Sequence, residues 1–272
     1  MASTVPPATD HGLARWLAWR SGQRLLALRA RIGYADPPAL RDAGDAGSHE
    51  LIMDELVRWR PSDAVLSEEG ADDPGRLSSE RVWIVDPLDG TTEFAEPNRV
   101  DWAVHIGLWA HGRLVAGAVG LPARHRVLAT ETPPPYPPIN DDGSIRIAVS
   151  RTRPPAFLGE LSAALGGAIF VPTGSAGVKA AAVIDGDVDA YVHVGVLHEW
   201  DFAAPVAVAI ATGLHASRLD GAGLRYNQPD PTVPDLLICR KDLVARLLVG
   251  LRACGIGGGD TGGGGTGAPL DA

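Results

Sequence analysis

The sequence predicts an α+β protein whose chain divides into two halves. In the first half, two helical segments precede a group of apolar strands, whereas strands and helices alternate in the second half. A proline-rich segment, residues 131–144, separates the two patterns. The halves are expected to comprise residues 1–138 and 139–254. A glycine-rich tail, residues 255–272, is too poor in apolar side chains to pack and is expected to be disordered.

The first half opens with a helix expected from Leu13 to Ile32, because leucine and isoleucine recur there at helical spacing and Asp10 suits an N-cap. A second helix is expected over residues 50–59, stopped by Pro61. Apolar runs then predict four strands, the last two paired as an antiparallel hairpin, at residues 64–67, 82–85, 102–109 and 113–120.

The second half shows alternating apolar runs and helical periodicity. The expected strands cover residues 145–150, 168–172, 189–194 and 236–240. The expected helices cover residues 156–165 and 176–185, a segment that opens at residue 200, and residues 242–251.

Composition excludes several classes of function. With 272 residues, of which 45% are hydrophobic, the chain can bury a sizeable core. Its net charge of −9 offers no footprint for nucleic acid or for an anionic membrane. Cys239 and Cys254 are too few for a disulfide framework and lack metal-ligand spacing. The polar N-terminus has no signal core, and no apolar run approaches the about 20 residues of a membrane span, so a soluble, cytoplasmic protein is expected.

Acidic residues stand at the ends of several expected elements. Asp86 and Asp89 end one strand, Glu68 follows another, and Asp201 opens a helix. Asp86 and Asp89 also suit an ordinary turn, and Asp201 an ordinary N-cap. Four such carboxylates in a chain with only two lysines instead favour a cage for Mg²⁺, which binds oxygen ligands and needs no histidine or cysteine. Two ions about 3.5–4 Å apart would clamp a phosphate and its attacking water.

The turn that follows these aspartates suits a phosphate. Gly90 lets the backbone approach a ligand closely. The N–H groups of Gly90, Thr91 and Thr92 would open a helical turn and so attract an anion. The Thr91 hydroxyl would hold a water molecule, whose proton a carboxylate would accept.

Three stretches in the expected order resemble signatures of one family. DPLDGTT, residues 86–92, resembles the DPxDGT signature of the inositol monophosphatase superfamily; WDFAAP, residues 200–205, resembles its WDxAA signature. LSEE, residues 66–69, is similar to the acidic pair that precedes the first signature. The resemblance runs from about residue 13 to residue 250. Within the superfamily the chain is most similar to the actinobacterial CysQ-type 3′-phosphoadenosine 5′-phosphate phosphatases, in residues 64–69, 81–94, 101–109 and 216–231.

This resemblance implies a five-layer αβαβα sandwich, of the inositol monophosphatase and fructose-1,6-bisphosphatase type, with the site between the two halves. It implies two or three Mg²⁺ ions, held by Glu68, Asp86, the carbonyl of Leu88, Asp89 and Asp201. The implied reaction is hydrolysis of 3′-phosphoadenosine 5′-phosphate, or its 5′-phosphosulfate analogue, to AMP or adenosine 5′-phosphosulfate in sulfur assimilation. Inhibition by Li⁺ is implied as well.

The resemblance also implies that Thr91 and an upstream aspartate activate water together with Glu68. The family shows a VTxAD-like stretch upstream, and counting back from Glu68 without gaps reaches residues 40–45. The aspartate is kept as Asp45, but Asp42 stands at the threonine position. A surface loop is therefore the alternative interpretation of this stretch.

The substrate side carries weaker signals. Gly174, Ser175 and Lys179 resemble the family's Gly-Ser-x-x-x-Lys stretch, in which the lysine would bind a second phosphate. Ser175 also suits a plain N-cap, and Lys179 a solvated surface position. Glu199 is expected to bind a sugar hydroxyl, and Arg225 a base or phosphate. The three histidines on or beside strands are interpreted as structural or surface residues: His105, His193 and His198.

Several alternatives remain open from the sequence. A haloacid-dehalogenase phosphatase uses DxDGT, but here one extra residue separates the two aspartates. A metal-dependent phosphate-binding regulatory protein would share the fold without the reaction. Inositol 1-phosphate and fructose 1,6-bisphosphate compete with the nucleotide as substrate. The expected partner is a small phosphorylated molecule, and the chain is expected to be a monomer or a homodimer.

Overall fold

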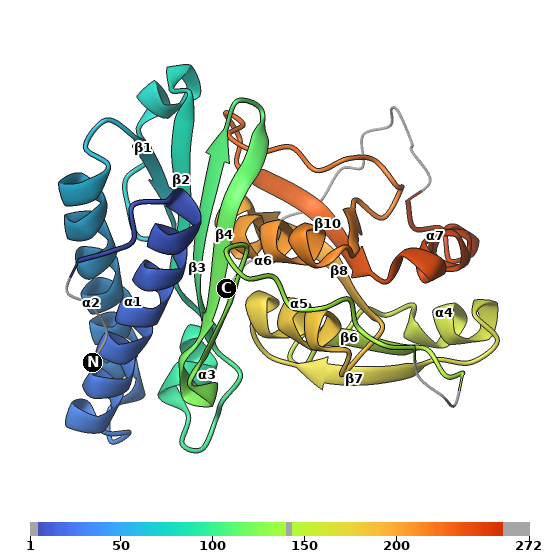
Figure 1. Ribbon diagram of the computed structural model, residues 1–272. Coiled ribbons are helices and arrows are strands. Elements are labelled where there is room, and N and C mark those ends of the chain that lie inside the picture. Colours follow the sequence, from blue (N-terminus) through green and yellow to red (C-terminus); the bar gives the residue numbers. More distant parts are fainter. Residues whose placement is uncertain (1–4, 140–142, 258–272) are drawn as a thin grey trace, which may run out of the picture.

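Two five-stranded sheets organise the fold, and helices pack on both faces of each sheet. The computed structural model describes residues 5–139 and 143–257. From one side to the other, the layers are helix, sheet, helix, sheet and helix (Figure 1). The predicted five-layer α+β sandwich is therefore confirmed.

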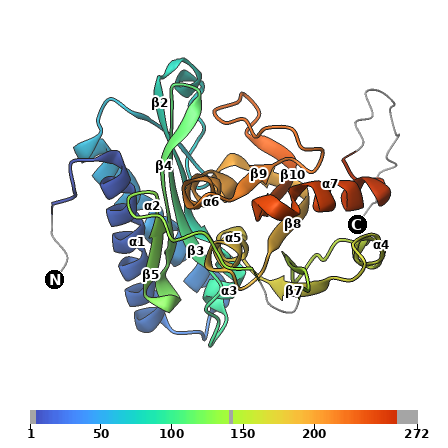
Figure 2. The same cartoon turned by 45° about the vertical axis from the view of Figure 1, so that its right-hand side comes forward.

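The first sheet has the strand order β1-β2-β3-β4-β5, with β1 parallel to β2 and the other neighbours antiparallel. Its strands are β1 (Ala64–Ser67), β2 (Arg81–Asp89), β3 (Ala103–Ala110), β4 (Arg113–Leu121) and β5 (Arg126–Ala129). The elements that accompany it in the chain are α1 (Asp10–Ile32), α2 (Pro37–Trp59), α3 (Thr91–Ala95) and the 3₁₀ helices η1 (Pro74–Ser78) and η2 (Pro122–Arg124). Helices α1 and α2 cover its outer face (Figure 2).

The second sheet has the strand order β7-β6-β8-β10-β9, in which β6 is parallel to β7 and β8, and β10 is antiparallel to β8 and β9. Its strands are β6 (Arg146–Ser150), β7 (Ile169–Thr173), β8 (Ala190–His198), β9 (His215–Ser217) and β10 (Thr232–Cys239). The helices are α4 (Leu158–Ala164), α5 (Ala176–Asp185), α6 (Glu199–Thr212), the 3₁₀ helix η3 (Lys241–Leu243) and α7 (Val244–Ala253).

Three apolar cores lie between the layers and hold them together. One joins α1 and α2 to the first sheet, and includes Leu17, Leu56 and Trp83. The central core packs α5 and α6 between the sheets. The third lies between the second sheet and the pair α4 and α7, where Leu161 and Leu247 are fully buried. Helices α5 and α6 contact both sheets, and their N-terminal ends bring residues of the second half to β2 and β3 of the first sheet.

Some predicted boundaries need correction. Thr9 rather than Asp10 is the N-cap of α1, because its side chain accepts the Gly12 N–H; Asp10 instead pairs with Arg60 at 2.9 Å. Helix α2 begins at Pro37, well before residue 50. The short edge strands β5 and β9 were not expected from the sequence.

The strands of the first sheet end at Ala129, and those of the second begin at Arg146. The predicted division at residue 138 falls between them and stays a prediction, as does the disordered tail, of which residues 258–272 lie outside the described residues. Among residues 5–139 and 143–257, no helix has the length and hydropathy to cross a membrane.

Candidate metal and phosphate site

Strand β2 ends in the two aspartates that its sequence singles out. Asp86 pairs with His105 across β2 and β3, and the register then shifts before Asp89. The shift has a local cause, because Pro87 has no N–H to donate to the strand ladder. The Leu88 N–H donates instead to Asp86 Oδ1, at 2.9 Å. Asp86, Asp89 and His105 consequently offer ligand atoms that all lie within 4.8 Å of one another.

The chain then turns through Gly90 into α3. Gly90 has a φ of 87°, in the left-handed region that favours glycine. A Cβ at this position would also lie 3.2 Å from Ser175 Cβ of the second half, a tight contact that leaves little room for a larger residue. The Thr91 hydroxyl donates to the Leu88 carbonyl at 3.2 Å. Two predicted site residues, Thr91 and Leu88, are thus in direct contact.

Glu68 reaches the site through the parallel pairing of β1 and β2. Ser67 pairs with Val85, and the Glu68 N–H donates to the Val85 carbonyl at 3.2 Å. Since Asp86 is the next residue on β2, the Glu68 carboxylate lies close enough to raise the pKa of Asp86. This pairing places the end of β1 beside the end of β2.

Asp201 enters from the opposite side, in the first turn of α6. It is not the N-cap, which is His198; its Oδ2 accepts the His198 N–H at 2.6 Å. Helix α6 packs very closely on the first sheet, where a Cβ on Gly107 would lie only 3.2 Å from the Ala204 nitrogen. This close packing brings Asp201 near enough to Asp89 for the Asp89 charge to raise the pKa of Asp201.

Asp45 lies on α2, not on the surface loop that was its alternative interpretation. One turn later, the buried Ser48 hydroxyl donates to the Pro87 carbonyl at 2.7 Å, which holds α2 against the end of β2. Burial and the nearby charges of Glu69 and Glu68 raise the pKa of Asp45 to about 7. Asp45 therefore belongs electrostatically to the acidic site.

The clustered carboxylates raise one another's pKa values. Burial, followed by the charges of Glu68, Asp89 and Asp201, raises the pKa of Asp86 well above its usual range. Burial and the neighbouring Asp201 raise the pKa of Glu68 to about 7. Burial likewise raises the pKa of Asp201, although the hydrogen bond from the His198 N–H opposes that shift. Such mutual repulsion is relieved by bound cations.

Asp89 differs from its acidic neighbours. Burial by itself would raise the pKa of Asp89, but the charge and hydrogen bond of His105 and the Ser175 hydroxyl lower it below the usual range. The Ser175 hydroxyl donates to Asp89 Oδ2. The N–H groups of Ala176 and Gly177, at the start of α5, donate to the same carboxylate at 3.1 and 2.6 Å. Asp89 is thus the ionised carboxylate at the contact between the halves.

His105 belongs to the site, although its sequence pattern suggested only a structural or surface role. Its side chain is fully buried, with Nε2 3.1 Å from Asp89 Oδ2 and Nδ1 3.1 Å from the Trp200 carbonyl. Burial alone would lower the pKa of His105, but the Asp89 carboxylate outweighs it and raises the pKa. The sequence placed residue 105 on a predicted strand, but only the structure shows that this strand pairs with β2 and sets residue 105 opposite Asp86.

The donor atoms of the site fit hard divalent cations. Carboxylate oxygens of Glu68, Asp86, Asp89 and Asp201 and the Leu88 carbonyl are the ligand types that Mg²⁺ and similar ions prefer. Burial and the neighbouring carboxylates raise the pKa values of Glu68, Asp86 and Asp201, and bound cations would offset both effects. Site geometry therefore supports the predicted use of divalent metal ions.

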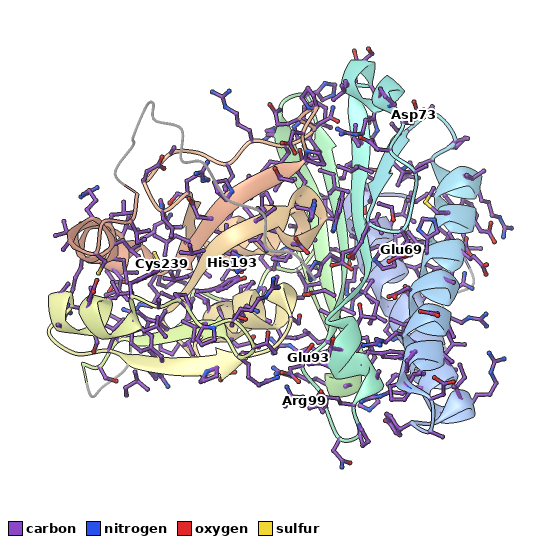
Figure 3. The ribbon with its side chains drawn as sticks, turned by 180° about the vertical axis from the view of Figure 1, so that it is seen from behind. Glu69, Asp73, Glu93, Arg99, His193 and Cys239 are labelled. Carbon is purple, nitrogen blue, oxygen red and sulfur yellow. The ribbon has the colours of Figure 1, made fainter. Side chains whose placement is uncertain are left out.

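A cavity of about 450 Å³ opens beside these carboxylates. The predicted site residues in its wall are Asp89, Gly90, Thr91, Gly174, Ser175, Lys179 and Asp201. Arg153 and His193, which the sequence did not assign to the site, also line it. Figure 3 shows Glu93 on α3, in the first half, and His193 on β8, in the second. The cavity therefore lies between the two halves, as the resemblance implied.

Lys179 is a buried lysine, which corrects its alternative interpretation as a solvated residue. Only 6% of the residue is exposed, and its ammonium donates to the Ser175 carbonyl at 2.7 Å. Burial lowers the pKa of Lys179, while Asp89 and Glu93 oppose that shift. Ser175 is the N-cap of α5, since its hydroxyl accepts the Val178 N–H at 3.0 Å. Ser175 thus combines its capping role with its contact to the acidic site.

His193 also needs correction, because it lines the cavity rather than serving only the sheet. Burial, followed by the charges of Lys179 and Arg153, lowers the pKa of His193 to about 4. Its ring is therefore neutral near pH 7 and offers a hydrogen-bonding group beside two cationic side chains. His198, stacked on Trp200 with ring centroids 4.5 Å apart, lines the cavity as well.

Two predicted substrate contacts lie outside this cavity. Glu199 is 1% exposed, and its two carboxylate oxygens accept the N–H groups of Asn227 and Gln228 at 2.6 and 2.8 Å. Arg225 is exposed to solvent. Neither residue lines the cavity, and the expected contact of Arg225 with a base or phosphate stays a prediction. The buried Glu199 carboxylate is occupied with backbone N–H groups and is not directed at a sugar.

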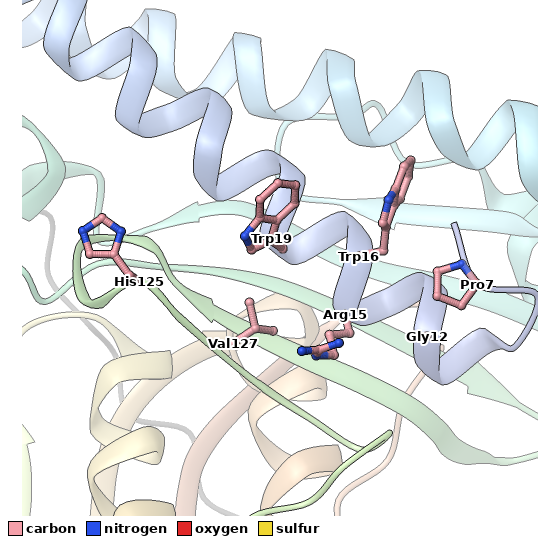
Figure 4. A pocket seen from close by; sticks show the side chains of 7 residues that line it. All are labelled: Pro7, Gly12, Arg15, Trp16, Trp19, His125 and Val127. Atoms are coloured by element: carbon pink, nitrogen blue, oxygen red, sulfur yellow. The ribbon is translucent and has the colours of Figure 1, made fainter. Parts of the chain in front are cut away.

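A second cavity, of about 360 Å³, lies beside α1 and β5. Figure 4 shows the side chains in its wall, which are Pro7, Gly12, Arg15, Trp16, Trp19, His125 and Val127. None of these residues is an acid, so this cavity does not share the chemistry of the metal site.

Comparison of the sequence with known proteins gives close relatives. One is 52% identical over 252 residues, 88% of this chain and 92% of the relative, and is named 3′-phosphoadenosine 5′-phosphate phosphatase from Mycobacterium leprae. Another is 33% identical over 196 residues, 68% of this chain and 78% of the relative, and is named 3′(2′),5′-bisphosphate nucleotidase CysQ from Escherichia coli. These names support the predicted enzyme class, a phosphoric monoester hydrolase.

Solved structures share the fold. CysQ from Bacteroides thetaiotaomicron matches with a TM-score of 0.70 and 25% identity, over 84% of this chain and 96% of that one. Mycobacterium tuberculosis SuhB matches with a TM-score of 0.70 and 22% identity, over 92% and 98% of the two chains. The sequence profile described as Inositol monophosphatase family matches residues 40–133 and 141–250. The chain therefore belongs to the inositol monophosphatase family.

Proposed function

We propose that the protein is a Mg²⁺-dependent phosphatase that hydrolyses 3′-phosphoadenosine 5′-phosphate to AMP and phosphate. The 5′-phosphosulfate analogue is a second proposed substrate, and sulfur assimilation is the proposed pathway. Relatives at 52% and 53% identity that carry the name of this activity support the proposal.

The observation that carries the proposal is the composition of the cavity wall. Asp89 and Asp201 lie in the same wall as Lys179, Arg153 and His193. A substrate with two phosphate groups suits such a wall, since one phosphate would lie at the acidic metal site and the other would meet the cationic side chains. An inositol monophosphate has only the first of these groups.

Residues of this chain suit direct attack by water. Divalent cations would supply the positive charge that holds the phosphate and stabilises the charge developing during transfer. The Thr91 hydroxyl donates to the Leu88 carbonyl and keeps its lone pairs for the hydrogen atoms of a water molecule. Asp45 and Glu68 are the carboxylates suited to accept the proton from that water. Their pKa values of about 7 apply to the protein without metal, and bound cations would lower them.

The direct test is a phosphate-release assay in which Mg²⁺ is omitted or added. With Mg²⁺, we expect kcat/KM for 3′-phosphoadenosine 5′-phosphate to exceed that for inositol 1-phosphate and for fructose 1,6-bisphosphate. A preference for inositol 1-phosphate would overturn the substrate while retaining the phosphatase. Phosphate binding without release from any of the three would instead support the regulatory-protein alternative. The proposal also expects inhibition by millimolar Li⁺.

A further inference from the structure

Arg76 is a fully buried arginine outside the cavity that no step of the proposed reaction uses. Its side chain is 1% exposed and lies on η1, in the segment that follows Glu68. Asp72 binds it in a bidentate manner, with 2.6 Å from Nε and 3.0 Å from Nη2. Such a buried guanidinium requires partners for its remaining N–H groups.

Those partners come from the second half of the chain. Arg76 Nη1 donates to Asn227 Oδ1 at 2.8 Å, and Nη2 donates to the Gln228 carbonyl at 3.0 Å. Asn227 Nδ2 donates back to the Arg76 carbonyl at 3.1 Å. Asn227 and Gln228 lie in the connection between β9 and β10. The side chain and backbone of Arg76 therefore both bind this connection.

Glu199 continues the network to the metal site. It accepts the Asn227 and Gln228 N–H groups with its two oxygens, and it is the first residue of α6. Asp201, a predicted metal ligand, follows two residues later in the same helical turn. A chain of hydrogen bonds thus runs from the segment after Glu68 to the turn that holds Asp201.

We propose that Arg76, Asn227 and Glu199 form a latch between the halves that positions Glu68 and Asp201 for divalent metal ions. This inference rests on the proposed metal-dependent function. None of the three residues lines the cavity, so they are positioning residues. Because two predicted ligands come from different halves, a small shift between the halves would change the ligand geometry that Mg²⁺ requires.

The latch is sensitive to single atoms. In Glu199→Gln, an NH₂ group replaces one of the two acceptor oxygens. This NH₂ group cannot accept the hydrogen bond of the backbone N–H that it faces. In Arg76→Met, the apolar stem is retained, but Asn227 Oδ1, the Gln228 carbonyl and Asp72 lose their donor. Both variants loosen the contact between the halves without changing any predicted metal ligand.

Arg218 offers a matched control. It binds Asp235 in the same bidentate manner, at 2.7 and 2.9 Å, but both residues lie in the second half. Arg218→Met therefore removes a comparable ion pair without touching a contact between the halves. The test is calorimetric titration of Mg²⁺ into the wild-type protein, Arg76→Met, Glu199→Gln and Arg218→Met, with thermal unfolding and phosphate release measured on the same samples.

We expect Arg76→Met and Glu199→Gln to weaken Mg²⁺ binding by about ten- to a hundredfold, the usual effect of substituting residues that orient metal ligands. Arg218→Met should bind Mg²⁺ like the wild type. The Mg²⁺ concentration for half-maximal activity should rise to match, with kcat largely recovered at saturating Mg²⁺. Should a variant fail to fold, Arg76→Lys provides the milder substitution.

Mg²⁺ titrations of the latch variants that coincide with the wild type would overturn the latch, even if thermal stability falls. An equal loss in Arg218→Met would also overturn it, because general destabilisation would then explain the effect. A wild-type protein that binds no Mg²⁺ would contradict the proposed function itself.

Discussion

Asp86 and His105 lie opposite each other on β2 and β3, with 3.7 Å between Asp86 Oδ2 and His105 Nδ1. The other ring nitrogen lies 3.1 Å from Asp89 Oδ2. One buried imidazole is therefore close to both aspartates of the DPLDG turn. Its Nδ1 also lies 3.1 Å from the carbonyl of Trp200, the residue before Asp201, so His105 links acids that arrive from both halves.

His105→Ala should lower kcat/KM by about five- to a hundredfold, because it leaves the Trp200 carbonyl and Asp89 Oδ2 without this buried partner, a loss of about 1–3 kcal/mol. Steady-state kinetics at saturating Mg²⁺ would measure it. His111→Asn, at the exposed tip of the same hairpin, is the control and should keep wild-type activity. Wild-type kinetics in His105→Ala would show that the ring only fills space.

Asp201→Asn and Asp89→Asn should each lower Mg²⁺-dependent phosphate release by at least about a hundredfold at low Mg²⁺, because each removes a charge and a predicted carboxylate ligand. Near-UV circular dichroism would check that the fold is retained. Glu50→Gln, an exposed acid on α2, serves as the control for lost negative charge. Full turnover in either aspartate variant under these conditions would contradict a metal site built on these carboxylates.

Without metal, the protein should lose thermal stability as the pH rises from about 4 through about 7. Asp45 and Glu68 have folded-state pKa values of about 7, raised from 3.8 and 4.5. A carboxyl group whose pKa is raised by folding contributes stability that is fully present below its pKa in the unfolded chain. That stability is lost as the pH rises through its pKa in the folded protein. Two groups act in the opposite sense. Asp89, whose pKa is lowered, does so only in more acidic solution. His193, whose pKa is lowered from 6.5 to about 4, offsets part of the decline between those two values.

Thermal unfolding in EDTA across this pH range would measure the loss, and Mg²⁺ should restore stability at the alkaline end because it binds the folded, ionised site. Asp45→Asn should flatten the decline, whereas Asp54→Asn, at an exposed position of the same helix, should keep it. A metal-free melting temperature that rises steadily from pH 4 to pH 8 would refute the assigned pKa shifts.

Local patterns predicted the centre of the site well. An apolar run that ends in DPLDG places a strand, a proline break and a glycine turn within a few residues, and the structure shows each of them. The predicted hairpin 102–120 likewise appears as β3 and β4. These features depend on near neighbours in the chain, so periodicity and turn chemistry were sufficient.

Long-range packing decided what local patterns missed. Helix α2 extends back to Pro37 through Gly44, although glycine is a weak helix former. Tertiary packing explains the glycine, because a Cβ there would lie only 2.7 Å from the Phe94 ring that packs against α2. Lysine side chains are seldom buried, so the sequence pattern did not reveal the burial of Lys179. The partners of Glu199 lie 28 and 29 residues away in the chain, beyond the reach of any local motif.

Solvent oxygen should enter the released phosphate in a single turnover, with no covalent phosphoenzyme. Asp86 is fully buried, and its Oδ1 accepts the Leu88 N–H, so it is poorly placed as a nucleophile. Mass spectrometry of phosphate formed in ¹⁸O-labelled water, with enzyme in excess, would measure the incorporation. An acyl-phosphate trapped on Asp86 would instead support the haloacid-dehalogenase mechanism.

Lys179→Ala should depress kcat/KM for 3′-phosphoadenosine 5′-phosphate about ten- to a hundredfold while sparing inositol 1-phosphate. A charge-assisted contact to a second phosphate contributes about 1.5–3 kcal/mol, and a monophosphate has no group to receive it. Competition kinetics with both substrates would measure the ratio. The control is Lys241→Ala, which removes the other lysine of the chain at an exposed position. The Lys179 ammonium also donates to the Ser175 carbonyl, so the variant can act through α5 as well as through the substrate. Equal losses for both substrates would show that Lys179 supports the N-terminus of α5 and does not read the second phosphate.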